Sequence, residues 1–206
     1  PRAVQRRFER LFIKLFMEEQ QSQITIFLDC SSSMNFGQPN KGFLAKQLAG
    51  IFCYLALNTF DRVGLVCINE TVESYLPSFS GKQSFWKALK FIEEAPFKGK
   101  TFLNSAIQRY QSLGSRGGTT IILTDLFSQD GYQEAIKYLQ YQKQEVSLIH
   151  ILSPEEIDPP WSGNIRLIDK EDQGYKDINL TPQILKAYKK TLDGFFRDTK
   201  EFCYNR

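Results

Sequence analysis

The chain has little of what zinc sites and membrane spans require. Its longest apolar stretches fall well short of the roughly 18 residues that cross a bilayer, so we expect no direct membrane insertion by this part of the protein. Its cysteines lack the short paired spacing of zinc sites, and such an inventory is typical of a reduced, cytoplasmic protein. The four cysteines are Cys30, Cys53, Cys67 and Cys203.

Several enzyme classes lack their characteristic residues here. The only histidine, His150, lies inside the apolar run VSLIHIL, where a buried or sheet-edge imidazole is more usual than a catalytic one. No GxSxG or GxxxxGK[ST] motif occurs, and Ser31 stands where aspartate-nucleophile phosphatases carry a second aspartate. The enzyme alternative that stays open is a metal-dependent hydrolase of phosphoesters, because a bound cation with a free coordination position can activate water.

The charge balance is too mild to indicate a nucleic-acid partner. Lys and Arg number 26 and Asp and Glu 23, which gives a formal net charge of +3. The basic residues between Arg2 and Lys14 are interpreted as a solvated end of the chain. Because the sequence begins with Pro1 rather than Met, we expect a piece of a longer protein, and a membrane tether elsewhere in that protein stays an open alternative.

Short apolar runs alternate with segments of helical period, which predicts a doubly wound, mostly parallel α/β sheet with helices on both faces. The segment 63–76 is predicted to form a hairpin that Pro77 closes, and it supplies the one antiparallel strand. The remaining strands are predicted at 24–28, 119–125, 146–152 and, on the edge, 165–168.

Five helices are predicted from apolar residues that recur at helical spacing. Thr181 and Pro182 are expected to open the last one, as N-cap and first helical residue. The predicted inner faces are Leu44, Leu48, Ile51, Phe52 and Leu55; Phe85, Leu89 and Ile92; Leu103, Ile107 and Tyr110; Tyr132, Ile136 and Leu139; and Ile184, Tyr188, Leu192 and Phe195.

Oxygen-bearing side chains follow two buried strands where each strand ends. The run 24–28 leads into DCSSS at 29–33, and the run 119–124 leads into Asp125, while Thr101 precedes the third helix. Ligands of open α/β sheets bind at the carboxyl ends of strands, and oxygen ligands suit a hard cation such as Mg²⁺. Each of these residues could instead only cap a helix or shape a turn. Together they predict a cation site formed by Asp29, Ser31, Ser33, Thr101 and Asp125. Cys30 is interpreted as a non-ligand, because thiolate is a soft ligand.

These residues resemble the metal-ion-dependent adhesion site of von Willebrand factor A domains, which reads DxSxS, then Thr, then Asp. The chain is also similar to a bacterial domain-of-unknown-function family, number fifty-eight, through LFIKLFMEE at 11–19, FLDCSSSMNFG at 27–37 and DRVGLV at 61–66. The resemblance implies that residues 24–206 form one such domain. Residues 1–23 would form an N-terminal segment whose strand, at about 11–17, pairs onto the sheet as a hairpin with 24–28.

The resemblance also implies a function. The five residues would hold Mg²⁺ or Mn²⁺, with Ca²⁺ as a further candidate, and one coordination position would stay open for an Asp or Glu carboxylate of a partner protein. Proteins of the second family often accompany MoxR-type AAA+ ATPases, so such an ATPase or its substrate is the expected partner. The expected function is therefore metal-dependent protein binding without catalysis.

Overall fold

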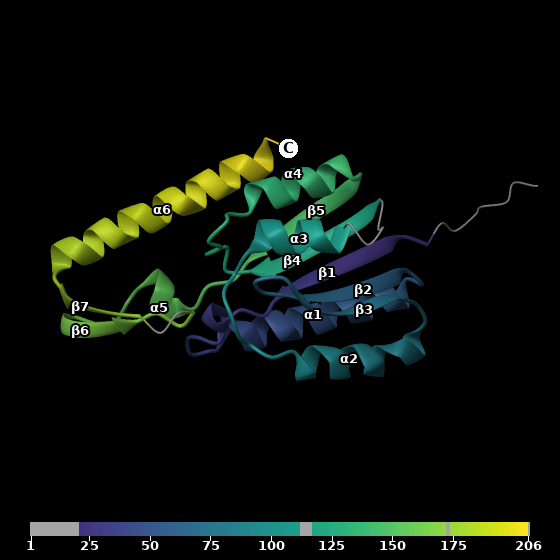
Figure 1. Ribbon diagram of the computed structural model, residues 1–206, viewed down its shortest axis with the longest axis horizontal. Coiled ribbons are helices and arrows are strands. Elements are labelled where there is room, and N and C mark those ends of the chain that lie inside the picture. The colour runs from purple at the N-terminus through teal and green to yellow at the C-terminus, as the bar shows by residue number, and fades with distance from the viewer. Residues whose placement is uncertain (1–20, 112–116, 172–173, 206) are drawn as a thin grey trace, which may run out of the picture.

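The computed structural model describes residues 21–111, 117–171 and 174–205. Five strands form the central sheet, in the order β3-β2-β1-β4-β5, and only β2 and β3 run antiparallel (Figure 1). The predicted doubly wound, mostly parallel α/β fold is confirmed. The strands are β1 (Gln23–Asp29), β2 (Arg62–Ile68), β3 (Val72–Phe79), β4 (Gly118–Thr124) and β5 (Gln144–His150).

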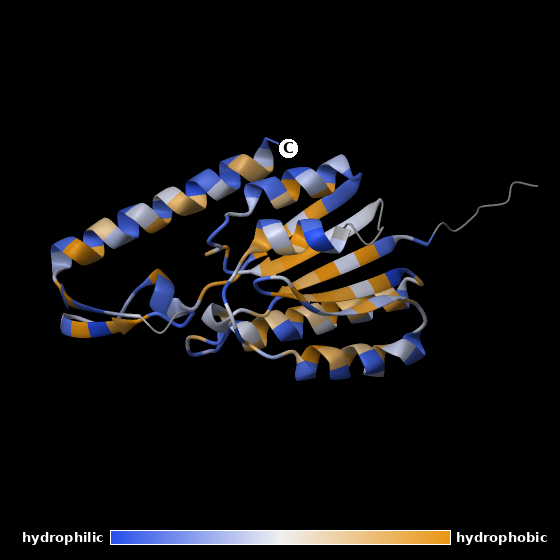
Figure 2. Cartoon of the chain, viewed as in Figure 1, coloured by the Kyte–Doolittle hydropathy of each residue, from blue (hydrophilic) through white to orange (hydrophobic). Residues whose placement is uncertain are grey.

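Helices cover both faces of this sheet. On one face α1 (Lys41–Asn58) and α2 (Phe85–Glu94) enclose a core around Ile26, Leu28 and Leu65. On the other face α3 (Leu103–Gln111) and α4 (Gln133–Tyr141) enclose a core around Phe27 and Ile122. Neighbouring residues of β1 therefore serve opposite cores, as the alternation of side chains along a strand requires. Figure 2 shows the resulting apolar strands between more polar helix surfaces.

The predicted inner face of α1 is partly wrong. Leu44, Ile51 and Leu55 are exposed, and only Leu48 and Phe52 pack against the core. The face that touches the sheet instead carries small residues, which allow the helix to approach closely. These small residues are Ala45, Ala49, Cys53 and Ala56. The helix is apolar on most of its surface, so periodicity could not indicate which side is inner.

Two predictions about strands also need correction. The segment 165–168 is not an edge strand of the main sheet, because β6 (Gly163–Ile168) pairs only with β7 (Tyr175–Leu180) in a separate antiparallel sheet. Pro159 and Pro160 precede β6 in an extended connection that leads away from β5. In the main sheet, β3 continues through Pro77 to Phe79, since an edge strand tolerates a residue that lacks an N–H group.

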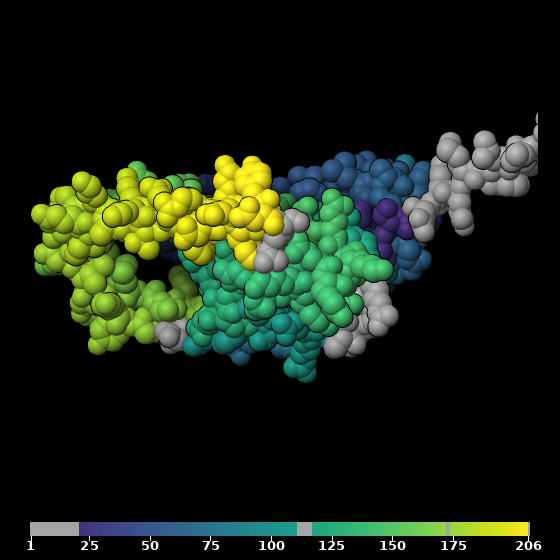
Figure 3. Space-filling view, turned by 90° about the horizontal axis from the view of Figure 1, so that it is seen from above, coloured from purple at the N-terminus to yellow at the C-terminus, as the bar shows by residue number. Residues whose placement is uncertain are grey.

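The last helix, α6 (Pro182–Tyr204), begins as predicted, with the Thr181 side chain accepting a hydrogen bond from the Ile184 N–H. Of its predicted inner face, Leu192 is buried and Phe195 packs against the core, but Ile184 and Tyr188 are partly exposed. The first half of α6 instead extends away from the central sheet, on the side of the molecule where β6 and β7 lie (Figure 1). We call the described residues of 154–192, which include α5 (Pro154–Ile157), the arm. An opening separates α6 from the segments beneath it (Figure 3).

The expected strand at about 11–17, and the boundary drawn after residue 23, concern a segment that lies largely outside the described residues. Its expected partner, β1, is hydrogen-bonded on both sides, to β2 and to β4. Within the described part of the chain, no helix is both long and apolar enough to span a membrane.

Candidate metal centre

The parallel pairing of β1 with β4 brings two strand ends together. Leu28 lies opposite Leu123, so Asp29 and Thr124 are the next residues at the carboxyl edge of the sheet. Oγ1 of Thr124 donates a 2.6 Å hydrogen bond to Oδ2 of Asp29, and both residues are fully buried. Thr124 thereby fixes the orientation of the Asp29 carboxylate, a role that sequence analysis did not assign.

The DCSSS segment turns its alternate side chains toward this edge. The N–H of Ser31 donates to Oδ1 of Asp29 at 3.0 Å, and the hydroxyls of Ser31 and Ser33 lie 3.0 Å apart. The Ser33 hydroxyl also donates to Oδ2 of Asp125 at 3.0 Å. Cys30 faces the opposite way, into the core under α1, where its thiol donates to the carbonyl of Leu28.

Thr101 is fully buried, and it does not serve as the N-cap of α3. The first N–H groups of α3 are bonded by Ser128 and Asp130 from another loop, at distances between 2.9 and 3.3 Å. The Thr101 hydroxyl donates instead to Oε1 of Glu171, 3.0 Å away. The alternative that Thr101 only caps a helix is therefore wrong, although its role as a metal ligand stays a prediction.

Asp125 ends β4 at a sharp turn. Its Oδ1 accepts the Phe127 N–H at 3.0 Å, and the intervening Leu126 has a φ of 63°, in the left-handed region that side chains such as leucine rarely adopt. Oδ2 is thereby left directed toward Ser33 and the DCSSS segment. Asp125 is thus both a turn residue and a member of the site.

Two charged residues that sequence analysis missed complete the site. The ammonium of Lys41, a residue only 1% exposed, lies 2.8 Å from Oδ2 of Asp125 and 2.6 Å from Oε1 of Glu156. Glu156 is held in turn by a capping box with Ser153 at the start of α5. The sequence did hold one indication of the role of Lys41. A lysine in the first position of a helix is unfavourable beside the positive end of the helix dipole, so its presence there suggests a carboxylate partner.

The electrostatics of the site favour an added cation. Burial, together with the negative charge of Asp125, raises the pKa of the Asp29 carboxyl to about 7, against the opposing bonds from Thr124 and Ser31. Burial likewise raises the pKa of Glu171, and the charge of Asp125 contributes. Lys41 supplies one positive charge to a group that also includes Glu156. A bound divalent cation would stabilise the ionised carboxylates.

The donor set fits a hard cation of the Mg²⁺ type. Two carboxylates and three hydroxyls supply oxygen ligands and leave room for water, which suits octahedral coordination. Among the described residues, no group of three or more His, Cys, Asp or Glu side chains could hold a metal, so the fit depends on the serine and threonine hydroxyls. A soft metal with thiolate or imidazole ligands does not fit this donor set.

His150 supports the turn rather than facing a nucleophile. Its Nε2 donates to the backbone carbonyl of Asp125 at 2.9 Å, and its ring packs against Phe127 and Phe195. Burial lowers the pKa of the imidazole, so the ring is neutral near neutral pH. The predicted burial of His150 is largely correct, since the residue is partly buried at the end of β5.

Two solved structures share this fold. BatB from Bacteroides thetaiotaomicron is similar to the chain with a TM-score of 0.55 and 20% identity, over 82% of this chain and 85% of that protein. An aerotolerance-related membrane protein from Bacteroides fragilis is similar with a TM-score of 0.56 and 20% identity, over 82% and 87%. At this identity the likeness shows the fold alone.

Sequence relatives point to a family without an assigned activity. Uncharacterized proteins of Mycobacterium bovis (Mb1516) and Mycobacterium tuberculosis (Rv1480) are 21% identical over 187 residues, which is 88% of this chain. The chain spans 59% of the length of these relatives. The profile of the family described as "Protein of unknown function DUF58" matches residues 3–193, and the chain therefore belongs to this family.

Proposed function

We propose that the chain is a von Willebrand factor A domain that binds proteins through a divalent cation. Asp29, Ser31, Ser33, Thr101 and Asp125 would hold Mg²⁺ or Mn²⁺, and Ca²⁺ would be accepted less readily because it prefers more ligands. A partner would offer an Asp or Glu carboxylate to the open position. The surrounding loop surface would select among partners.

One observation carries this proposal. Two segments that are far apart in sequence, 29–33 and 124–125, bring their oxygen side chains together through the bonds Ser31–Ser33, Ser33–Asp125 and Thr124–Asp29. The loop before Thr101 is held beside them by the backbone bond from the Ser32 N–H to the Gly99 carbonyl, 3.0 Å long. Two buried carboxylates close enough to raise a pKa are costly to ionise without a compensating cation. Two buried carboxylates that are this costly to ionise are more readily explained by a role in ligand binding than by a contribution to the stability of the fold.

The partner follows from the family resemblance alone, and the compartment from the cysteine inventory. We propose a MoxR-type AAA+ ATPase, or one of its substrates, as the partner, and a cytoplasmic site of action. The longer relatives have room for further domains, so these proposals concern the domain rather than the whole protein. No nucleic-acid role is proposed.

A binding role fits the site better than the alternative of phosphoester hydrolysis. General-base catalysis needs a titratable group within hydrogen-bond reach of the attacking water. The only histidine uses its Nε2 on a backbone carbonyl, and Lys41 is engaged by two carboxylates. Turnover of a generic phosphoester that disappears in Asp29→Ala would favour the hydrolase instead.

The proposal is tested by titrating Mn²⁺ into the chelator-stripped chain while free Mn²⁺ is followed by paramagnetic resonance. One saturable site is expected in the native chain, and none in Asp29→Ala. Asp61→Ala, which changes an aspartate at the opposite edge of the sheet, serves as the matched control and should bind normally. Absence of binding at millimolar Mn²⁺ in the native chain would contradict the proposal.

A further inference from the structure

Two side chains of the arm reach the candidate metal centre. Glu156 contacts Lys41, as described above, and Glu171 contacts Thr101. Glu171 lies three residues beyond the end of β6, and its Oε1 accepts the 3.0 Å hydrogen bond from the buried hydroxyl of Thr101, a predicted metal ligand that lies 70 residues earlier in the chain. Glu171 is therefore a carboxylate of this chain that lies directly beside a predicted ligand of the cation.

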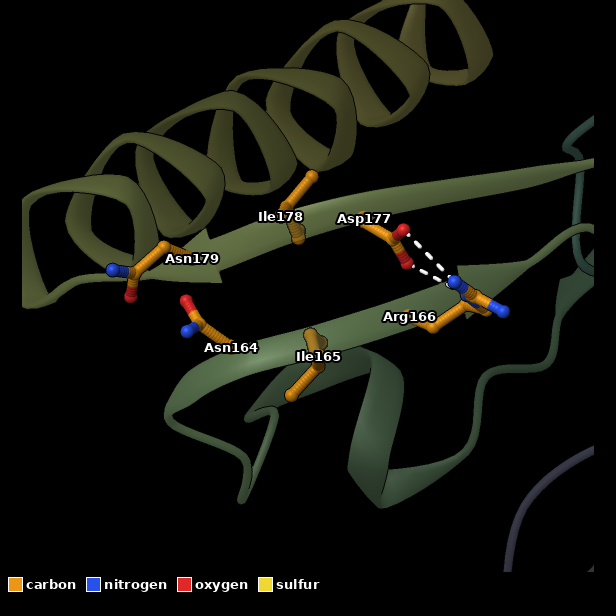
Figure 4. A pocket seen from close by; sticks show the side chains of 6 residues that line it. All are labelled: Asn164, Ile165, Arg166, Asp177, Ile178 and Asn179. Carbon is orange, nitrogen blue, oxygen red and sulfur yellow. Dashed lines mark hydrogen bonds and ion pairs between the residues drawn. The ribbon is translucent and has the colours of Figure 1, made fainter.

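Backbone hydrogen bonds are made on the N-terminal side of Glu171. The N–H of Glu171 donates to Oδ1 of Asp169 at 2.7 Å, and the N–H of Asp169 donates to the carbonyl of Gly174 at 2.7 Å. Across the two strands, Arg166 and Asp177 face each other and form two bonds of 2.7 and 3.0 Å (Figure 4). These contacts limit the conformations from which Glu171 approaches Thr101.

The charges at the site make this approach unfavourable unless a cation is bound. Glu171 is partly buried, and it adds a negative charge beside Asp125, whose carboxylate already lies near that of Asp29. Lys41 is engaged by Asp125 and Glu156, and no hydrogen bond or ion pair between Lys41 and Glu171 is present among the described contacts. Among the described residues no three His, Cys, Asp or Glu side chains are already gathered to hold a metal, so a bound cation would draw the Glu171 carboxylate inward from its place beside Thr101.

We propose that Glu171 is an internal ligand that occupies the open position of the bound cation until a partner's carboxylate displaces it. This inference rests on the proposed function and names its regulation. A tethered carboxylate has a high effective concentration, so it excludes weak acidic ligands, whereas a partner with additional contacts displaces it. Release of Glu171 would also free the β6–β7 sheet from the metal centre, so partner binding and arm position would be coupled.

The test measures how strongly Mn²⁺ bound to the whole chain relaxes the protons of water. This relaxation reports how many exchangeable waters the ion coordinates. Glu171→Gln is compared with the native chain at metal saturation. Glu94→Gln, which neutralises an exposed carboxylate on α2, is the matched control. Thermal unfolding confirms that each variant is folded.

We expect the bound Mn²⁺ to gain one exchangeable water in Glu171→Gln, and none in Glu94→Gln. Acetate, added as a free carboxylate probe, should displace that water in Glu171→Gln and lower the relaxation. In the native chain, where Glu171 already excludes the water, acetate should leave the relaxation nearly unchanged. The Mn²⁺ affinity should fall several-fold.

Three results would overturn the inference. Equal water relaxation in the native chain and Glu171→Gln, with metal bound in both, would show that Glu171 does not coordinate, and the proposed function would survive. Complete loss of metal binding in folded Glu171→Gln would make Glu171 a permanent ligand rather than a displaceable one. Failure of the native chain to bind Mn²⁺ would remove the proposed function and this inference together.

Discussion

The ammonium group of Lys41 lies 2.8 Å from Oδ2 of Asp125, in a pair that is almost fully buried. Lys41 also contacts Glu156 at 2.6 Å, so it joins the first turn of α1 to the end of β4 and to α5. The lysine therefore has two effects. It offsets the charge of Asp125 when no metal is bound, and it repels a metal that binds the same carboxylate.

Replacement of Lys41 should separate these two effects. Lys41→Met leaves Asp125 buried without its partner, so we expect the metal-free chain to lose about 3–5 kcal/mol of unfolding free energy. Saturating Mn²⁺ should restore more stability to this variant than it adds to the native chain. Thermal unfolding with and without Mn²⁺ measures both effects. Lys90→Met, on the exposed surface of α2, should change neither, and equal Mn²⁺ stabilisation of Lys41→Met and the native chain would contradict the expectation.

The hydroxyl of Thr124 should matter for metal affinity more than for stability. Thr124→Val removes the 2.6 Å bond that orients Asp29, and loss of such an orienting contact typically lowers metal affinity by about 10–100-fold. Thr120→Val is the matched control, because Thr120 is equally buried on the same strand and bonds only to Gln144 among the described contacts. Thr120→Val should lose about 1 kcal/mol of stability, and Thr124→Val more, because the Thr124 hydroxyl also accepts the buried Leu126 N–H at 3.0 Å. Equal Mn²⁺ affinities in the two variants would show that Thr124 does not orient a ligand.

Metal binding should weaken in mild acid. The folded-state pKa of Asp29 is raised to about 7, so below that pH a proton occupies the carboxyl and must leave when metal binds. The apparent Mn²⁺ affinity should fall by about tenfold per pH unit below pH 7, as competition by a single proton requires. Without metal the sign is opposite, because a raised acid pKa means that stability falls as pH rises from about 4 to 7. Mn²⁺ titrations between pH 5.5 and 8 test this; a flat affinity would contradict it.

The cysteines should differ sharply in reactivity. Burial raises the pKa of the Cys53 thiol to about 12, and Cys30 and Cys67 are also buried, whereas Cys203 is an exposed residue near the end of α6. A thiol reagent at pH 8 should therefore modify Cys203 first, because the thiolate must be accessible to react. Cys203→Ser should abolish the rapid phase, which mass spectrometry would measure. A rapid phase that persists in this variant would mean that a core cysteine is accessible.

The sequence was sufficient to predict the sheet because the buried strands are short, apolar and rich in branched residues. The same pattern placed Asp29 and Asp125 at strand ends, and β1 and β4 proved to be neighbours. The inner face of α1 could not be predicted, because alanines rather than leucines touch the sheet. The face of α1 that touches the sheet is decided by how closely the helix can approach, and the hydropathy of its residues does not indicate that distance.

A strand was predicted at 165–168, but β7, the separate sheet that it forms with β6, and the charged partners of the site were missed for a different reason. β6 and β7 are mostly exposed, so they carry little of the apolar signal that marks a core strand. Lys41, Glu156 and Glu171 are charged residues of a kind usually assigned to the surface. Their contacts join segments 70 to 115 residues apart in sequence, and no local pattern indicates such distant pairs.

Leu126 shows what holding Asp125 in place demands of the chain. Its left-handed backbone would suit glycine or asparagine, but its side chain is buried in the core beneath α3 and α4, where a leucine packs well. Few residue types both tolerate a left-handed backbone and fill an apolar core. At this position the core therefore contains a leucine, although the backbone conformation disfavours it. The turn next to the aspartate is consequently strained in this structure, and a substitution that relaxes the strain would be expected to loosen the core.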